Sequence, residues 1–245
     1  MMMQAQANVS PQIGAFFSHS GGYLRPQGGT PSTRKYRAKE QIFAQGDGAS
    51  TIYEVIAGCI KLMRFLSDGR QQIVGFFFAD DIIGLTAGEL YSYSAVAITP
   101  TRLRPTKKLD VLRRMMSDDK LGENIIRLAS DEIAAAHDQM TLLGCKRPLE
   151  KVASFIAAMS RKSSIYDEVS KQVYLPMTQM DMGSYLGLAL ETVCRTFQIL
   201  KKQGVISDAD RHFIRINDID ALLGLADITT EAWSKDFVNR SQHAR

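Results

Sequence analysis

The sequence predicts an α+β protein built from an N-terminal antiparallel β-roll, one long helix and a C-terminal winged helix-turn-helix. Short apolar runs separated by glycine and aspartate turns fill the first half of the chain, which is typical of an antiparallel roll. An unbroken helical pattern follows, and two further helical patterns then flank a glycine turn. The boundaries we expect are a flexible arm at 1–33, the roll at 34–117, a dimerisation helix at 118–144, the winged domain at 145–226 and a tail at 227–245.

Length and composition are those of an ordinary soluble protein. The 245 residues are 45% hydrophobic and 23% charged, which is enough for two modest cores. No segment approaches the roughly 20 apolar residues that a transmembrane helix needs, and the first residues lack the pattern of a secretory signal. We therefore expect a cytoplasmic protein with no membrane contact. The net charge of +4 favours phosphate contact only mildly.

The first half of the chain contains the candidate strands. Residues 1–33 are rich in Gly, Ser, Gln and Pro, a composition that predicts a mobile arm. Apolar runs at 52–56, 60–65 and 73–78 then alternate with turns. Residues 67–70, Ser-Asp-Gly-Arg, form the turn signal of a hairpin between two of these runs.

The middle of the chain predicts one helix from about residue 120 to 143. Such a helix would be about 36 Å long, so a single small roll cannot cover its whole apolar stripe. One reading is packing within one chain. The reading we favour is a parallel two-helix dimer seam, with Ala129 and Ala136 allowing close approach. The seam residues we predict are Leu121, Ile125, Ala129, Ile133, Ala136, Met140 and Leu143.

Residues 178–204 predict a helix-turn-helix. Thr178 followed by Asp181 is typical of a capped helix start, and Gly187 permits the turn. The second helix begins near Leu190 and ends at Gly204, with apolar residues on one face and polar residues on the other. In this motif the N-terminal part of the second helix enters the major groove of DNA.

The polar face of the second helix carries the candidate base contacts. Glu191 can accept a hydrogen bond from the amino group of cytosine, and Arg195 can donate two bonds to guanine O6 and N7. The alternative is a surface ion pair between these two residues, which are four positions apart. An apolar pair at 205–206, a polar turn and an alternating run at 213–216 read as a two-stranded wing. This context favours DNA binding.

The same residues carry a family resemblance. Residues 183–188 and the run from Glu191 to Arg195 resemble the winged helix-turn-helix of the CRP/FNR superfamily of bacterial transcription regulators. The FNR and FixK branches are the most similar, because their recognition helix carries E-x-x-S-R; here Cys194 replaces the serine. Residues 42–43, 45–47, 53–55, 58 and 68–71 look like the family's β-roll signature, a jelly roll like that of cyclic-nucleotide-binding domains.

The resemblance implies a homodimer that reads a palindromic TTGA…TCAA-like site in double-stranded DNA and works with RNA polymerase, as an activator of oxygen-limitation or redox-linked genes. It implies base contacts by Glu191, Arg195, Leu190, Thr192 and Cys194. The phosphate contacts we expect are Ser184, Tyr185, Lys201 and Lys202, with solvated surface as the alternative for the lysines.

No cofactor or metal is expected. FNR holds an iron–sulfur cluster through N-terminal cysteines, and no cysteine precedes Cys59 in this chain. The cyclic AMP-binding relatives have an arginine where this chain has Tyr93, so a cyclic phosphate would lack its counter-charge. A ligand-gated regulator remains the alternative function. An enzyme is the weakest option, because no phosphate loop, zinc signature or Ser/His/Asp grouping has the required spacing.

Cys194 is the candidate for regulation. The start of a helix and the adjacent Arg195 both favour a thiolate, the form that reacts with oxidants. We hypothesise that oxidation of Cys194 weakens DNA binding. The alternative is that cysteine is an inert replacement for serine at this position.

Overall fold

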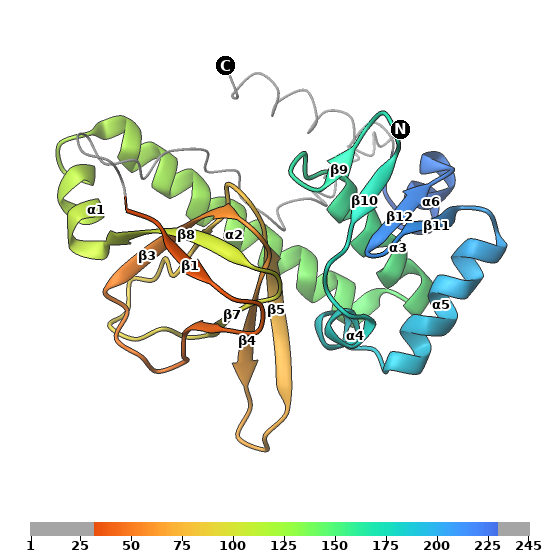
Figure 1. Cartoon of the computed structure of the whole chain (residues 1–245), viewed down its shortest axis with the longest axis horizontal. Coiled ribbons are helices and arrows are strands. Elements are labelled where there is room, and N and C mark those ends of the chain that lie inside the picture. The colour runs from red at the N-terminus through yellow and green to blue at the C-terminus, as the bar shows by residue number, and fades with distance from the viewer. Residues whose placement is uncertain (1–31, 230–245) are drawn as a thin grey trace, which may run out of the picture.

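The computed structural model describes residues 32–229, in two lobes joined by a long helix (Figure 1). The predicted arm and tail lie almost wholly outside these residues. One lobe is an antiparallel roll, and the other contains the helix-turn-helix and its wing. The predicted α+β fold class is therefore confirmed.

The roll consists of two four-stranded antiparallel sheets with the orders β1-β8-β3-β6 and β2-β7-β4-β5. Its strands are β1 (Arg34–Tyr36), β2 (Gln41–Phe43), β3 (Thr51–Ala57), β4 (Ile60–Phe65), β5 (Gln71–Phe77), β6 (Ile82–Ile83), β7 (Ser94–Ala97) and β8 (Thr101–Lys107). Alternate side chains such as Val55, Ile60 and Leu103 are buried between the sheets. The predicted turn at 67–70 joins β4 to β5, with Gly69 at φ 83°.

Two helices follow the roll, α1 (Lys108–Met115) and α2 (Asp119–Cys145). The Asp118 side chain accepts a hydrogen bond from the backbone N–H of Leu121, which caps the start of α2. The 27 residues of α2 extend for about 40 Å. No helix among residues 32–229 is both long enough and apolar enough to cross a bilayer.

The structure corrects two of the predicted seam residues. Leu121 and Ile125 are buried in the roll of their own chain, together with Leu128, Ile52 and Val111. They cannot face a partner helix. The sequence pattern misled because α2 is apolar on two faces, and only the face turned away from the roll is free.

The free face of α2 carries a regular apolar stripe. Ile126, Ile133 and Met140 are 66%, 60% and 61% exposed and recur every seven residues. Three further exposed residues lie three positions after each of them: Ala129, Ala136 and Leu143. This is the a and d pattern of a two-stranded coiled coil, and we call these six residues the α2 stripe. Five of them are among the predicted seam residues, and Ile126 replaces the two buried ones.

The second lobe consists of α3 (Pro148–Ser160), β9 (Tyr166–Asp167), β10 (Gln172–Tyr174), α4 (Gln179–Leu186), α5 (Leu190–Lys202), β11 (Ile206–Asp210), β12 (Phe213–Ile216) and α6 (Ile219–Leu225). Pro148 occupies the first turn of α3, where its missing N–H costs nothing. Helix α3 is buried along its length from Lys151 to Ser160, because α5, α6 and β10 pack around it. The strands form one antiparallel sheet in the order β11-β12-β10-β9.

The two lobes share one hydrophobic core. Phe76 of β5 contacts both Phe155 of α3 and Tyr185 of α4, with ring centroids 6.0 and 5.5 Å apart. Beside them lies an ion pair between Asp81 of the roll and Lys162 of the second lobe, with both side chains only 3% exposed. Burial raises the pKa of Asp81, although the Lys162 ammonium opposes this shift. The winged lobe is therefore held firmly against the roll.

Candidate nucleic-acid interface

Local chemistry fixes the first helix and the turn of the helix-turn-helix. The Thr178 hydroxyl accepts from the backbone N–H of Asp181 at 3.0 Å, and the Asp181 carboxylate accepts from the backbone N–H of Thr178 at 3.2 Å. This reciprocal pair is a capping box. Gly187 ends α4 with φ 63°, a left-handed conformation that favours glycine. At Gly183 a Cβ atom would lie 2.6 Å from the Leu188 carbonyl oxygen, so α4 can approach the turn only without a side chain there.

Helix α5 has one buried and one exposed face, as predicted. Val193, Phe197 and Leu200 are at most 4% exposed and pack into the core of the lobe. The side chains of Glu191 and Arg195 lie on the opposite, exposed face. Within the described residues, no ion pair joins these two side chains. Both charged groups are therefore available to a ligand, which favours the base-contact reading over the surface pair.

Three further predicted base contacts lie on the same helix. Leu190 is 42% exposed at the start of α5, and Thr192 is half-buried one turn from Thr196, whose hydroxyl donates to the Thr192 carbonyl. Cys194 is also half-buried. Its thiol donates to the side-chain oxygen of Gln179 at 2.7 Å. Gln179 is the first residue of α4, so this bond ties the two helices of the motif together.

Two predicted phosphate contacts are wrong in this structure. Tyr185 is 1% exposed, enclosed by Phe76 and Phe155, and burial raises the pKa of its hydroxyl well above the usual value. The Ser184 hydroxyl points at β5, where it accepts from the N–H of Ile73 and donates to the carbonyl of Gln71, both at 3.1 Å. Both residues serve the contact between lobes, and nothing local in the sequence signals this.

The two predicted lysines have different surroundings. Lys201 forms an ion pair with Asp208 of β11 at 2.6 Å, so part of its charge is already compensated. Lys202 is exposed in the last turn of α5. Sequence reasoning missed the wing arginines, Arg211 at the turn between β11 and β12 and Arg215 on β12, which are both exposed. Both arginines lie in the predicted wing that follows α5, and this position could have identified them as phosphate contacts.

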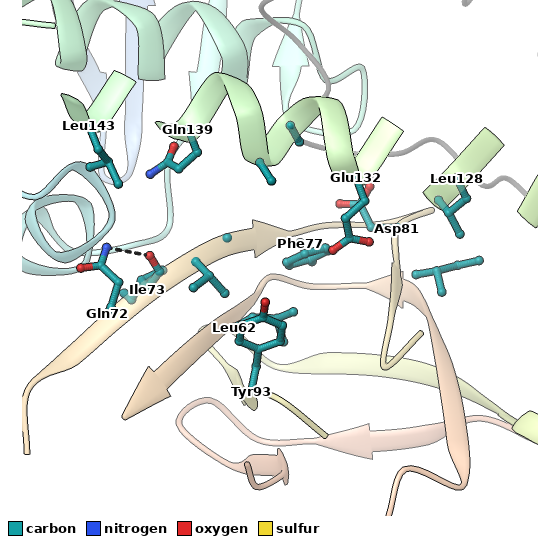
Figure 2. A pocket seen from close by; sticks show the side chains of 15 residues that line it. Leu62, Gln72, Ile73, Phe77, Asp81, Tyr93, Leu128, Glu132, Gln139 and Leu143 are labelled. Carbon is teal, nitrogen blue, oxygen red and sulfur yellow. Dashed lines mark hydrogen bonds between the residues drawn. The ribbon is translucent and has the colours of Figure 1, made fainter. Parts of the chain in front are cut away.

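A cavity of about 290 Å³ lies between α2 and strands β4 and β5 (Figure 2). Apolar side chains line much of it, and the carboxyl groups of Glu132 and Asp81 lie on its wall. Burial of its carboxyl group raises the pKa of Glu132, although the residue as a whole remains partly exposed to solvent. No lysine or arginine is among the described residues that line this cavity. Tyr93 lies in its wall, whereas Arg104 is held by Glu54 within the roll, so the cavity offers no cation to a phosphate.

Comparison with known proteins agrees with this architecture. A family model described as "Crp-like helix-turn-helix domain" matches residues 150–225, and one described as "Cyclic nucleotide-binding domain" matches residues 33–118. The nitrogen fixation regulation protein FixK of Azorhizobium caulinodans is 32% identical over 79% of this chain and 78% of its own length. The transcriptional activatory protein AadR of Rhodopseudomonas palustris is 34% identical over 70% of this chain and 72% of its own.

Among solved structures, FixK2 from Bradyrhizobium japonicum aligns with a TM-score of 0.75 and 31% identity, covering 80% of this chain and 97% of that one. The alignment thus covers most of this chain and nearly all of that one. The chain belongs to the CRP/FNR family of DNA-binding transcription regulators, and its relatives include FixK-type proteins.

Proposed function

We propose that this protein is a homodimeric, cytoplasmic transcription activator that reads a twofold-symmetric, TTGA…TCAA-like site. The observation that carries the proposal is the exposed face of α5, where Glu191 and Arg195 stand free on a helix whose other face is fixed in the core. Such a helix presents its N-terminal side chains to the major groove. Selection of bound sequences from a random duplex pool tests it, and a twofold-symmetric motif with a guanine in each half-site is expected.

The proposed base contacts follow from donor and acceptor chemistry. The guanidinium of Arg195 matches O6 and N7 of guanine, and the carboxylate of Glu191 matches the amino group of cytosine. Leu190, Thr192 and Cys194 lie near these two residues on α5 and could contact thymine methyl groups or the backbone. Lys202, with Arg211 and Arg215 of the wing, would supply phosphate contacts that position the helix.

Dimerisation is supported by the α2 stripe. Two isoleucines and a methionine recur every seven residues, each followed three positions later by an alanine or a leucine, and this matches the seam of a parallel two-stranded coiled coil. Twofold symmetry then gives two recognition helices, which must lie about 34 Å apart to enter successive major grooves on one face of DNA. Sedimentation equilibrium should give a mass of twice 27.2 kDa.

Activation through RNA polymerase is proposed from the names of the relatives, several of which are called transcriptional activators. No enzymatic activity is proposed. Transcription in vitro with purified bacterial RNA polymerase, on a template carrying the selected site upstream of a promoter, tests the direction of control. Increased transcript is the expected result, and decreased transcript would indicate a repressor.

We also propose that oxidation of Cys194 weakens DNA binding. Hydrogen peroxide converts the thiol to a sulfenic acid and water. The S–H group that donates a hydrogen bond to Gln179 is then lost. Further oxidation adds negative charge beside the DNA phosphates. The test compares operator affinity before and after peroxide in the wild type and in Cys194→Ser. Equal losses in both proteins would contradict the proposal.

The alternative function is a regulator gated by a ligand in the roll. The cavity of Figure 2 favours an uncharged ligand over a cyclic nucleotide, because carboxyl groups and no cation line it. Gel-shift titrations with and without cyclic AMP test the cyclic-nucleotide form of this alternative. No change in affinity is expected, and a tighter complex with cyclic AMP would support gating by a cyclic nucleotide.

A further inference from the structure

Three side chains outside the winged lobe hold α4 in place. The Lys61 ammonium of β4 pairs with the Asp181 carboxylate at 2.6 Å, and the Gln72 amide of β5 donates to the Ser184 carbonyl at 2.6 Å. The Gln139 amide of α2 donates to the Tyr185 carbonyl at 2.8 Å. We call these three bonds the α4 docking contact.

The residues of the docking contact come from two different parts of the structure. Lys61 and Gln72 belong to the roll, whereas Gln139 belongs to the proposed dimerisation helix. Figure 2 shows Gln72 and Gln139 at the end of the cavity where Leu143 lies. The carbonyls of residues 184 and 185 are in the last turn of α4, where intrahelical partners run out. Held from both sides at adjacent carbonyls, α4 cannot rotate relative to α2 without breaking at least one of these bonds.

Helix α5, the recognition helix, forms one rigid unit with α4. The Cys194–Gln179 bond joins the two helices, and the tight Gly183–Leu188 approach fixes their turn. The docking contact therefore adds directional bonds to the shared core of the two lobes, and these bonds help to set the orientation of α5 relative to α2. In a dimer whose axis runs between two α2 helices, that orientation also sets the distance and angle between the two recognition helices.

Resting on the proposed dimeric DNA binding, we propose that the docking contact determines which half-site spacing the protein accepts. One added base pair moves a half-site by about 3.4 Å and rotates it by about 35°, since B-DNA repeats in 10–10.5 base pairs over about 34–36 Å. A dimer whose two recognition helices are fixed relative to each other can place both of them in the major groove at only one half-site spacing. Lys61, Gln72 and Gln139 are thus positioning residues that touch no DNA, and they give the protein selectivity for spacer length.

The test uses duplexes that carry two identical half-sites separated by the selected spacer, or by one base pair more or less. Wild-type affinity should fall about tenfold for either altered spacer. In the double variant Gln72→Ala, Gln139→Ala the three spacers should differ by less than about threefold. A base change at the guanine of a half-site should weaken both proteins equally, because α5 itself is unchanged. Gln41→Ala, which removes an exposed glutamine of β2, is the matched control and should behave like the wild type.

Retained spacer dependence in the folded, dimeric double variant would overturn the inference. If the double variant does not fold, Lys61→Gln replaces it in the same assay, since Lys61 is the more accessible partner of its ion pair at 21% exposure. Failure of the proposed function gives a different result: wild-type binding would then ignore the half-site sequence as well as the spacer.

Discussion

The ion pair between Asp81 and Lys162 gives the sharpest prediction about how the two lobes are held together. Both side chains are 3% exposed, and the Asp81 carboxylate also accepts from the backbone N–H of Phe78 at 2.7 Å. Lys162→Met keeps the volume and removes the charge, which leaves a buried carboxylate without its cation. Removing one partner of a buried pair typically costs about 3–5 kcal/mol, a large share of the roughly 5–15 kcal/mol that stabilises a folded protein.

A double-mutant cycle separates this effect from packing. Asp81→Asn retains a carbonyl oxygen for the Phe78 N–H and should cost a similar amount, because the buried ammonium loses its counter-charge. The double variant should recover most of the loss, since neither charge is then buried alone. Urea unfolding at one fixed protein concentration measures all four proteins. A cost below about 1 kcal/mol for Lys162→Met, typical of exposed pairs, would refute the reasoning.

Three further predictions concern the DNA contacts, the dimer and the cavity. Arg195→Ala should lose about 1–3 kcal/mol at the selected site while non-specific binding remains, because one bidentate guanine contact is removed; titration of specific and random duplexes measures this. Ile133→Glu places a charge in the α2 stripe, while Ile126 and the rest of the stripe stay unchanged. This variant should be monomeric in sedimentation equilibrium. Glu132→Gln should raise the unfolding temperature at pH 7 but not at pH 4. Burial raises the pKa of Glu132, so the folded state holds this proton more tightly than the unfolded state does. The free energy of unfolding is therefore unaffected by the carboxyl group below about pH 4.3 and falls as the pH rises through the raised pKa.

Each of these has a contrary outcome. Equal losses of specific and random binding in Arg195→Ala would assign that residue to phosphate contact. A dimer of unchanged stability in Ile133→Glu would place the interface elsewhere. Identical pH profiles for the wild type and Glu132→Gln would show that the carboxyl group is well solvated in the folded state.

The sequence was most informative where structure depends on neighbouring residues. The capping box of Thr178, the turn at Gly187 and the polar face of α5 all follow from residues within one or two turns, and each is found where it was predicted. The hairpin at 67–70 is local in the same sense.

Features that depend on distant residues could not be read in this way. Periodicity places Leu121 and Ile125 in the dimer seam, because it shows that a face is apolar but not what covers that face; in the structure the roll covers it. Ser184 and Tyr185 look like surface residues of a helix-turn-helix until β5 is placed against them. Lys162 and Asp81 are 81 positions apart, and no spacing rule connects them.

The most direct test of the account is the stoichiometry of the DNA complex. Native mass spectrometry of the protein with a duplex carrying two inverted half-sites should show two chains bound together, with no population carrying one chain. A duplex in which one half-site is reversed should bind far more weakly. Single chains that occupy each half-site independently, with no effect of half-site orientation, would contradict the claim that paired recognition helices on one dimer read the DNA.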